Sequence, residues 1–337
     1  MNYQITVMPS GATCTAREDE TILEATLRQG ILLPSGCKNG ACGACKGSVL
    51  AGDIEHGHYQ PHALTAEERE AGKALFCCAR ARSDLVIECR QASRAGEIVT
   101  KLMPARIEAL EKAAPDVIVL RLMLPASETL AFRAGQYIDI LLPENRRRSY
   151  SIANAPEEKG FLELHVRRVP GGFFTTQLFE TMKVKDILRF EGPHGSFFLR
   201  EDSVKPVILL ASGTGFAPIK SIVEHTLAQK IQRSLHIYWG CRRQADLYRR
   251  ALPERWAADH PHIRHTPVLS MPDAGWKGRS GYVHAAVAAD YPDLSGHEVY
   301  ACGNPAMVEA ARRDFLALGL PEEAFYADAF TFAEPGK

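Results

Sequence analysis

The sequence lacks a net charge, a long apolar run and a low-complexity tract, and each absence argues against a class of protein. Forty basic and forty acidic side chains cancel, so the chain offers no general field for attracting nucleic acid or an anionic membrane. No apolar stretch approaches the ~20 residues that a membrane-spanning helix needs. With 46% hydrophobic and 24% charged residues, the composition is that of a protein that folds.

The first residues, Met1 to Val7, lack the basic and apolar regions of a secretory signal, which favours a cytoplasmic location. Cytosolic thiols are kept reduced, so the nine cysteines are expected to be metal ligands or buried thiols rather than disulfides. The length of 337 residues predicts two or three domains of roughly 100–150 residues each. No internal repeat is visible.

The residue patterns change twice along the chain. Alternating residues at 3–8, a helical pattern at 20–29 and short strands up to residue 89 predict a small α+β unit, followed by a polar linker at 91–101. Evenly spaced strand patterns then predict a small antiparallel barrel, with strands at 103–110, 117–124, 137–142, 149–153 and 162–169. Apolar strands alternating with helices predict a parallel sheet, from the segments 207–211, 218–229, 236–239, 299–302 and 305–318.

The most specific motif is a cysteine loop near the start of the chain. Cys37, Cys42 and Cys45 have Cys-x4-Cys-x2-Cys spacing, and Cys77 and Cys78 follow downstream. This spacing is typical of plant-type [2Fe-2S] sites, and the glycines and alanines between the cysteines leave room for backbone amides to turn toward the sulfurs. A four-cysteine zinc site is the alternative, but such sites usually pair two short-spaced cysteine units.

Two further groups of motifs are suited to binding phosphate. Arg148, Tyr150 and Ser151 open an expected strand, and an arginine fork matches a phosphate. The pair Gly171–Gly172 precedes a helix expected to offer free amides and a hydroxyl cap. Strand ends also run into helices at Gly213-Thr214-Gly215 with Pro218, and at Cys302-Gly303 with Pro305.

Together these motifs resemble the ferredoxin-NADP reductase superfamily over essentially the whole chain. The resemblance implies a β-grasp ferredoxin domain at 1–95, an antiparallel β-barrel FAD domain at 101–201 and a parallel-sheet NAD(P)-binding α/β domain at 202–337. The segment from Leu75 to Ala81 resembles the ferredoxin pattern in which the ligand lies two residues before an alanine, and this selects Cys77 as the fourth ligand. Cys14, Cys78 and Cys89 are then expected to be packed thiols.

The resemblance also assigns roles at the flavin. Arg148 would meet the FAD pyrophosphate, Tyr150 would lie against the flavin ring, and Ser151 would hydrogen-bond near its reactive nitrogen. The turn from Gly172 to Thr175 would hold the pyrophosphate from the other side. Further cofactor-binding residues by this resemblance are His165, Arg167 and Phe330, although core packing explains Phe330 equally well.

At the nicotinamide, the resemblance places phosphate contacts on Gly213, Thr214, Gly215 and Pro218, with Gly303 and Pro305 opposite. Cys302 would lie beside the nicotinamide and help to orient hydride transfer. Arg242 and Arg243 are able to accept the 2'-phosphate of NADPH, but similar iron-sulfur reductases mostly prefer NADH. NADH is therefore the expected donor and NADPH the alternative.

The domain order resembles the reductase components of phenol and benzoate oxygenases and, still more closely, CDP-6-deoxy-glucoseen reductases. It implies an iron-sulfur flavoprotein oxidoreductase that passes electrons through FAD and the cluster to an acceptor protein, such as a CDP-4-keto-6-deoxyglucose 3-dehydrase. An aromatic or phenol-type oxygenase is the alternative acceptor. A stand-alone diaphorase or flavin reductase and a redox-sensing module are further alternatives. A monomer that docks transiently is expected.

Overall fold

The computed structural model describes residues 2–41, 43–89, 92–94 and 98–330. The chain divides into two compact units. The first contains residues 1–98, 195–197 and 328–331, and the second contains the remainder. No helix in the described part of the chain is long and apolar enough to cross a membrane.

The first unit is built on a five-stranded mixed sheet with the order β2-β1-β8-β4-β6. Strand β1 is antiparallel to β2 and parallel to β8, and helix α1 begins at a Thr21 capping box in which Glu24 returns the hydrogen bond. Buried aliphatic residues and Phe76 form its core. The elements are β1 (Asn2–Met8), β2 (Ala12–Arg17), α1 (Ile22–Arg28), β3 (Ile31–Leu32), β4 (Lys46–Ala51), β5 (Ile54–Glu55), α2 (Ala66–Glu70), β6 (Lys73–Leu75), β7 (Arg80–Ala81), β8 (Leu85–Glu88) and β9 (Ser93–Arg94).

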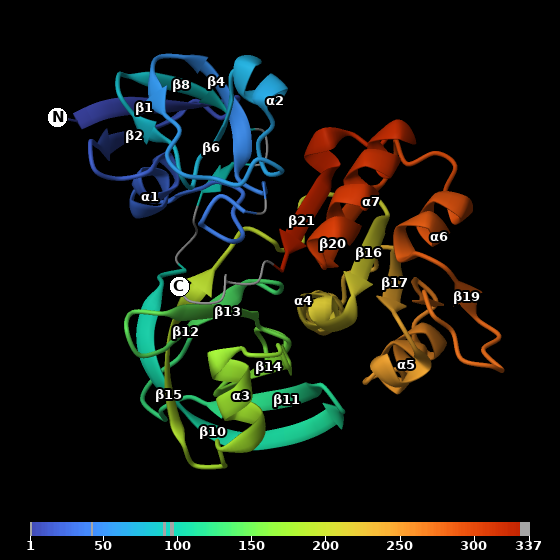
Figure 1. Cartoon of the computed structure of the whole chain (residues 1–337). Coiled ribbons are helices and arrows are strands. Elements are labelled where there is room, and N and C mark those ends of the chain that lie inside the picture. Colours follow the sequence, from blue (N-terminus) through green and yellow to red (C-terminus); the bar gives the residue numbers. More distant parts are fainter. Residues whose placement is uncertain (1, 42, 90–91, 95–97, 331–337) are drawn as a thin grey trace. The chain divides into compact units, whose positions relative to one another are not determined.

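The second unit begins with a six-stranded antiparallel sheet with the order β13-β12-β15-β10-β11-β14. A bridge between Ile152 and Leu164 joins its two ends, so the sheet closes into a barrel. Helix α3 adds Phe174 and Leu178 to the barrel core and lies beside the barrel strands in Figure 1. The elements are β10 (Lys101–Ala114), β11 (Val117–Met123), β12 (Tyr137–Leu141), β13 (Arg147–Ser151), β14 (Phe161–Arg167), α3 (Phe173–Glu180) and β15 (Ile187–His194).

The same unit continues into a second six-stranded sheet with the order β19-β18-β17-β16-β20-β21. The pairs that join β16 to β17 and β20, and β18 to β17 and β19, are parallel. Helices α4 and α5 cover one face, and α6 packs on α7 over the other, as right-handed crossovers require (Figure 1). The elements are β16 (Val207–Ser212), α4 (Phe216–Ala228), β17 (Leu235–Cys241), α5 (Ala251–Asp259), β18 (Ile263–Leu269), β19 (Arg279–Ser280), α6 (Val283–Asp290), β20 (Glu298–Gly303), α7 (Pro305–Ala317) and β21 (Phe325–Ala329).

The predicted fold class is confirmed, and the differences are local. Strand β15 was not predicted, although Leu188 and Phe190 are buried between exposed neighbours in the alternation of a half-buried strand. The sequence analysis also named no element for α5, β18 or α6. Within the predicted linker, Ser93–Arg94 pairs with β3 as strand β9 and Lys101 already belongs to β10, while residues 91 and 95–97 lie outside the described part.

A buried ion pair lies at the edge of the parallel sheet. Arg233 donates to a Glu298 carboxylate oxygen at 2.7 Å, and both side chains are at most 7% exposed. The Tyr300 hydroxyl donates to the same oxygen at 3.1 Å, and Arg233 also donates to the carbonyls of Arg200 and Lys205. Because all of these partners are satisfied, the pair fixes the start of β20 beside the loop that enters β16.

We expect Glu298→Gln to lower the free energy of unfolding of this sheet by about 3–5 kcal/mol, because it leaves the Arg233 charge buried without its counter-ion. All three tryptophans of the chain lie after residue 238, so urea unfolding followed by tryptophan fluorescence reports on this part alone. The control is Glu128→Gln, which removes the exposed partner of Lys101 and should change stability by less than about 1 kcal/mol. Equal effects of the two variants would contradict the account.

Candidate functional site

The cysteine loop of the first unit directs backbone amides at sulfur. The Ala41 amide donates to the Cys37 sulfur at 3.3 Å, and the Cys77 amide donates to the Cys45 sulfur at 3.4 Å. Cys45 and Cys77 are buried and Cys37 is half-buried. Amide hydrogen bonds of this kind stabilise sulfur ligands that carry negative charge, as an iron-sulfur cluster requires.

Crowding of the thiols is the second feature of this loop. The hydrogen bond with Cys45 is the largest influence that raises the pKa of the Cys77 thiol, and burial and the nearby Cys37 add to it. A thiol in such surroundings is deprotonated at neutral pH only when a bound metal cation replaces its proton. The amide hydrogen bonds to the Cys37 and Cys45 sulfurs are the observation that suits an iron-sulfur cluster.

Cys42 lies outside the described residues, so the set of four ligands stays a prediction. Among the residues that are described, no three His, Cys, Asp or Glu side chains stand in metal-ligand geometry. The choice between the adjacent cysteines also stays a prediction, because the Cys78 sulfur lies only 3.5 Å from that of Cys77. A Cβ at Gly40 would lie 2.8 Å from the Cys78 sulfur, so only glycine lets the cysteine loop lie this close to Cys78.

On strand β13 the predicted flavin residues alternate between two faces. Tyr150 pairs with Ile138 and its ring lies 5.4 Å from that of Phe174, while Ser151 pairs with Tyr137 on the other face. Burial raises the pKa of the Tyr150 phenol, so it stays protonated at neutral pH. Arg148 is half-buried and donates to the Arg147 carbonyl at 2.7 Å. One strand thus presents a guanidinium, a ring and a hydroxyl within four residues.

The helix after the glycine pair differs from the prediction in one respect. The expected hydroxyl cap is wrong: the N-cap is Gly172, and no side chain caps the helix. The buried Thr175 hydroxyl instead bonds back to the Val169 and Gly172 carbonyls, at 3.2 Å each. The hydroxyl fixes the turn, and the first amides of α3 are left without a side-chain cap, an arrangement that favours an anion.

The two predicted nicotinamide motifs meet where the strand order reverses. Ala211 pairs with Cys302 at the carboxyl ends of β16 and β20, and the Ser212 hydroxyl accepts the Asn304 amide at 2.8 Å. A Cβ at Gly215 would lie 2.2 Å from the Cys302 carbonyl oxygen, and one at Gly303, where φ is +124°, would lie 2.4 Å from the Ser212 hydroxyl. Only glycine permits this approach, and the carboxyl ends of neighbouring parallel strands are where open α/β sheets bind ligands.

The barrel places two of its predicted residues beside the Gly213–Gly215 turn and Phe216. A Cβ at Gly213 would lie 3.0 Å from a guanidinium nitrogen of Arg167, whose Nε donates to Asp116 at 2.8 Å. His165 is buried, with its ring nitrogens 2.8 Å from the Tyr248 hydroxyl and 3.0 Å from Glu163. Burial lowers the pKa of His165 despite the carboxylate, so the imidazole is neutral at physiological pH.

Several residues of the site carried no signal that the sequence analysis used. The Trp239 indole donates to the Gly213 carbonyl at 2.9 Å and stacks on Phe216, with ring centres 4.0 Å apart. Tyr248 meets the Trp239 ring edge-on. These aromatic side chains pack against the Gly213–Gly215 turn and the helix residue that follows it. Only Phe216, which directly follows Gly215, offered a clue in the sequence, because Trp239 and Tyr248 are more than twenty residues away from the turn.

The remaining predicted residues are placed as follows. Thr214 and Pro218 are buried at the turn, Pro305 opens α7 and is half-buried, and Cys302 is fully buried in β20. Phe330 follows β21, is half-buried and belongs to the stretch grouped with the first unit, so its role at the flavin stays a prediction. The structure therefore brings the two nicotinamide motifs together with Arg167.

Comparison with known proteins divides the chain into three matches. Residues 5–82 match the 2Fe-2S iron-sulfur cluster binding domain, residues 104–199 the oxidoreductase FAD-binding domain, and residues 209–313 the oxidoreductase NAD-binding domain. These are the three cofactor domains expected from the motifs, in the expected order.

Whole-length relatives have the same organisation. The CDP-6-deoxy-L-threo-D-glycero-4-hexulose-3-dehydrase reductase of Yersinia pseudotuberculosis is 42% identical over 330 residues, covering 98% of this chain and 99% of that protein. Reductase component 1 of the terephthalate 1,2-dioxygenase of a Comamonas species is 34% identical, over 100% and 99% of the two chains. The crystal structure of the Amycolatopsis reductase GcoB superimposes with a TM-score of 0.79 at 36% identity, covering 98% and 99%.

We expect Gly215→Ala to slow flavin reduction by nicotinamide at least about a hundredfold, because a methyl group 2.2 Å from the Cys302 carbonyl displaces the turn by roughly an ångström. Anaerobic stopped-flow absorbance of the flavin measures this rate. Gly296→Ala is the matched control, since its added Cβ meets no atom within 4 Å. If Gly215→Ala reduced its flavin as fast as Gly296→Ala, this turn would not belong to the nicotinamide site.

Proposed function

Because this chain belongs to the family of electron-transfer flavoprotein reductases that combine a 2Fe-2S, an FAD-binding and an NAD-binding domain, we propose that it transfers electrons from NADH to an iron-sulfur dehydrase that acts on a nucleotide-linked sugar. The contact between the Gly213–Gly215 turn and Cys302–Gly303, with Arg167 of the barrel beside it, carries the redox part of this proposal. Full-length identity of 42% to the Yersinia reductase supports the acceptor class.

The cofactors divide the chemistry: nicotinamide supplies two electrons as hydride, FAD takes the pair, and a [2Fe-2S] cluster passes electrons singly. In this proposal Arg148 and the first amides of α3 bind the flavin pyrophosphate. Tyr150 lies on the ring, and Ser151 hydrogen-bonds at its reactive edge. The Gly213–Gly215 turn binds the nicotinamide phosphates, and the buried Cys302 orients the ring. Cys37, Cys42, Cys45 and Cys77 hold the cluster, in a cytoplasm that keeps thiols reduced.

We expect Cys42→Ser to abolish cluster-dependent transfer and to spare the flavin. NADH-dependent reduction of cytochrome c, a one-electron protein acceptor, should fall at least about a hundredfold, while ferricyanide reduction, which the flavin serves directly, should stay within about twofold. Iron content and both activities are measured on the same preparation. Cys14→Ser, at a buried thiol outside the cluster loop, is the control and should keep both activities.

Three outcomes discriminate the functions. A Cys42→Ser variant with undiminished cytochrome c reduction excludes the cluster as the exit for electrons. Vigorous turnover of free flavin by the wild-type chain supports a stand-alone flavin reductase instead. Reduction of a purified aromatic-ring oxygenase, with none of a nucleotide-sugar dehydrase, supports the second acceptor class, to which the terephthalate dioxygenase reductase component belongs.

The preference for NADH rests on the charges beside Arg242. This exposed side chain follows β17, with Asp246 at 3.5 Å and Asp116 at 3.9 Å from its guanidinium nitrogens. Asp116 also accepts from Arg167, so Asp246 is the carboxylate whose charge bears on Arg242. It repels the doubly charged 2'-phosphate of NADPH, whereas a ribose hydroxyl can donate to it.

We therefore expect Asp246→Asn to raise kcat/KM for NADPH by about tenfold, which corresponds to about 1.4 kcal/mol, with a much smaller change for NADH. Steady-state ferricyanide reduction with each nucleotide measures the ratio. Asp259→Asn, at the exposed end of α5, is the control for a simple change in net charge. An equal gain from both variants would remove the specific role of Asp246.

A further inference from the structure

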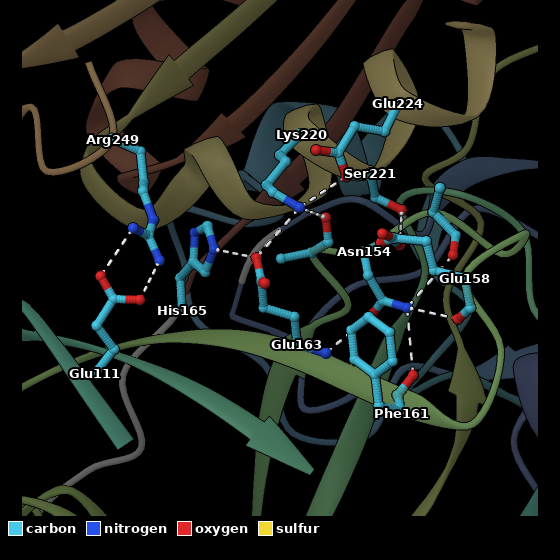
Figure 2. Close-up of polar contacts among 12 residues, drawn as sticks. Glu111, Asn154, Glu158, Phe161, Glu163, His165, Lys220, Ser221, Glu224 and Arg249 are labelled. Carbon is cyan, nitrogen blue, oxygen red and sulfur yellow. Dashed lines mark hydrogen bonds and ion pairs between the residues drawn. The ribbon is translucent and has the colours of Figure 1, made fainter. Parts of the chain in front are cut away.

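Lys220 is a lysine buried in α4, where its side chain is 9% exposed. Its ammonium has three oxygen partners: Glu224 at 2.7 Å, Glu163 at 3.2 Å and the Ala153 carbonyl at 3.2 Å. An ammonium group has three N–H donors, so every donor has a partner. Figure 2 shows Lys220 reaching from its helix toward Glu163.

Two of these three partners belong to the barrel. Glu163 lies on β14, and Ala153 follows β13, whereas Glu224 lies one turn further along α4. The next residue, Ser221, makes another link, since its buried hydroxyl donates to the Asn154 carbonyl at 2.7 Å. The N-terminal half of α4 is thus joined to the barrel at three points (Figure 2).

The barrel side of these contacts is itself held rigidly. The Asn154 side chain is fully buried and its amide donates to the carbonyls of Ala155, Glu158 and Phe161, while its oxygen accepts the Glu163 amide at 2.9 Å. Burial alone would raise the pKa of Glu163, but the hydrogen bond with His165 and the charge of Lys220 lower it to about 2. Glu163 is therefore an ionised partner at neutral pH.

The residues that these contacts join lie close in the sequence to the predicted cofactor motifs. Ala153 comes two residues after Ser151, and Lys220 comes five residues after Gly215 in the helix that the nicotinamide turn opens. Glu163 also binds His165, which lies two residues before Arg167 on β14. A displacement of α4 against the barrel would therefore change the distance between the flavin and nicotinamide motifs.

We propose that Lys220 and Ser221 are positioning residues that set the nicotinamide at the hydride-transfer distance from the flavin. The inference rests on the cofactor sites proposed above. In the step concerned, the C–H bond of the reduced nicotinamide breaks, its hydrogen and both electrons pass to the flavin, and the nicotinamide leaves oxidised. Rates of such transfers depend steeply on placement, and a shift of about 1 Å costs about a hundredfold.

The test compares Lys220→Met with Lys101→Met. The Lys101 side chain is 41% exposed, and its partners, Glu128 and the Thr129 carbonyl, lie between β11 and β12, so the control makes the same chemical change without touching the junction. Anaerobic stopped-flow with NADH and with NADH deuterated at C4 gives the reduction rate, the nucleotide affinity and the isotope effect. FAD content and thermal unfolding are measured alongside.

We expect Lys220→Met to reduce flavin at least about tenfold more slowly, with a larger isotope effect and an NADH dissociation constant within about twofold of wild type. Ser221→Ala should slow the step less, Lys220→Arg should recover part of the rate, and Lys101→Met should match wild type. A purely structural role would lower thermal stability and FAD content together and leave the isotope effect unchanged.

A Lys220→Met variant that keeps its FAD and reduces it at the wild-type rate overturns the inference. If that variant does not fold, Ser221→Ala decides the matter in the same way, since it removes one hydroxyl from the junction. Failure of the proposed function is a separate result, because the wild-type chain itself would then not reduce its flavin with NADH.

Discussion

A lysine ammonium can remain buried only where oxygen atoms replace its water. For Lys220, two of those oxygens are supplied by the barrel and one by its own helix. The charge therefore makes burial of this part of α4 depend on the barrel being in place. Since the same helix follows the Gly213–Gly215 turn, one buried charge relates the parallel sheet to the strands that present Arg148, Tyr150 and Ser151.

The contact between the ends of β16 and β20 depends on a second constraint, the absence of side chains where the two chain segments touch. Gly215 and Gly303 let the turn after β16 contact the end of β20 at distances that a methyl group would forbid. The Trp239 indole donates a hydrogen bond to the Gly213 carbonyl and so holds the turn in place. The surrounding packing makes this turn rigid, and a rigid turn is what the proposed phosphate binding needs.

Much of this arrangement was predictable because the chemistry fixes residue types at short spacings. The loop from Cys37 to Cys45 and the two glycine turns were of this kind, and the three predicted domain types are those that the comparisons match. The contact between Lys220 and Glu163 was not predictable, because the residues are far apart in the sequence and a lysine in a helix is ordinarily exposed. The hydroxyl cap predicted for α3 was wrong, since Thr175 satisfies its hydroxyl within the preceding turn. Strand β15 was missed because Gly192–Pro193, just before its last residue His194, is typical of a turn rather than of a strand.

The central step of the proposed function is the conversion of a two-electron donor into a one-electron source within one chain. In the proposed function, the barrel and parallel sheet form the part that accepts hydride, and the cysteine loop of the first unit forms the part that releases electrons. An anaerobic titration with NADH, followed by flavin absorbance and by low-temperature electron paramagnetic resonance of the cluster, tests this most directly. The account predicts uptake of about three electrons per chain, two by the flavin and one by the cluster, with the resonance of a reduced [2Fe-2S] centre appearing as NADH is added. A flavin that bleaches fully while an intact cluster stays silent would contradict it.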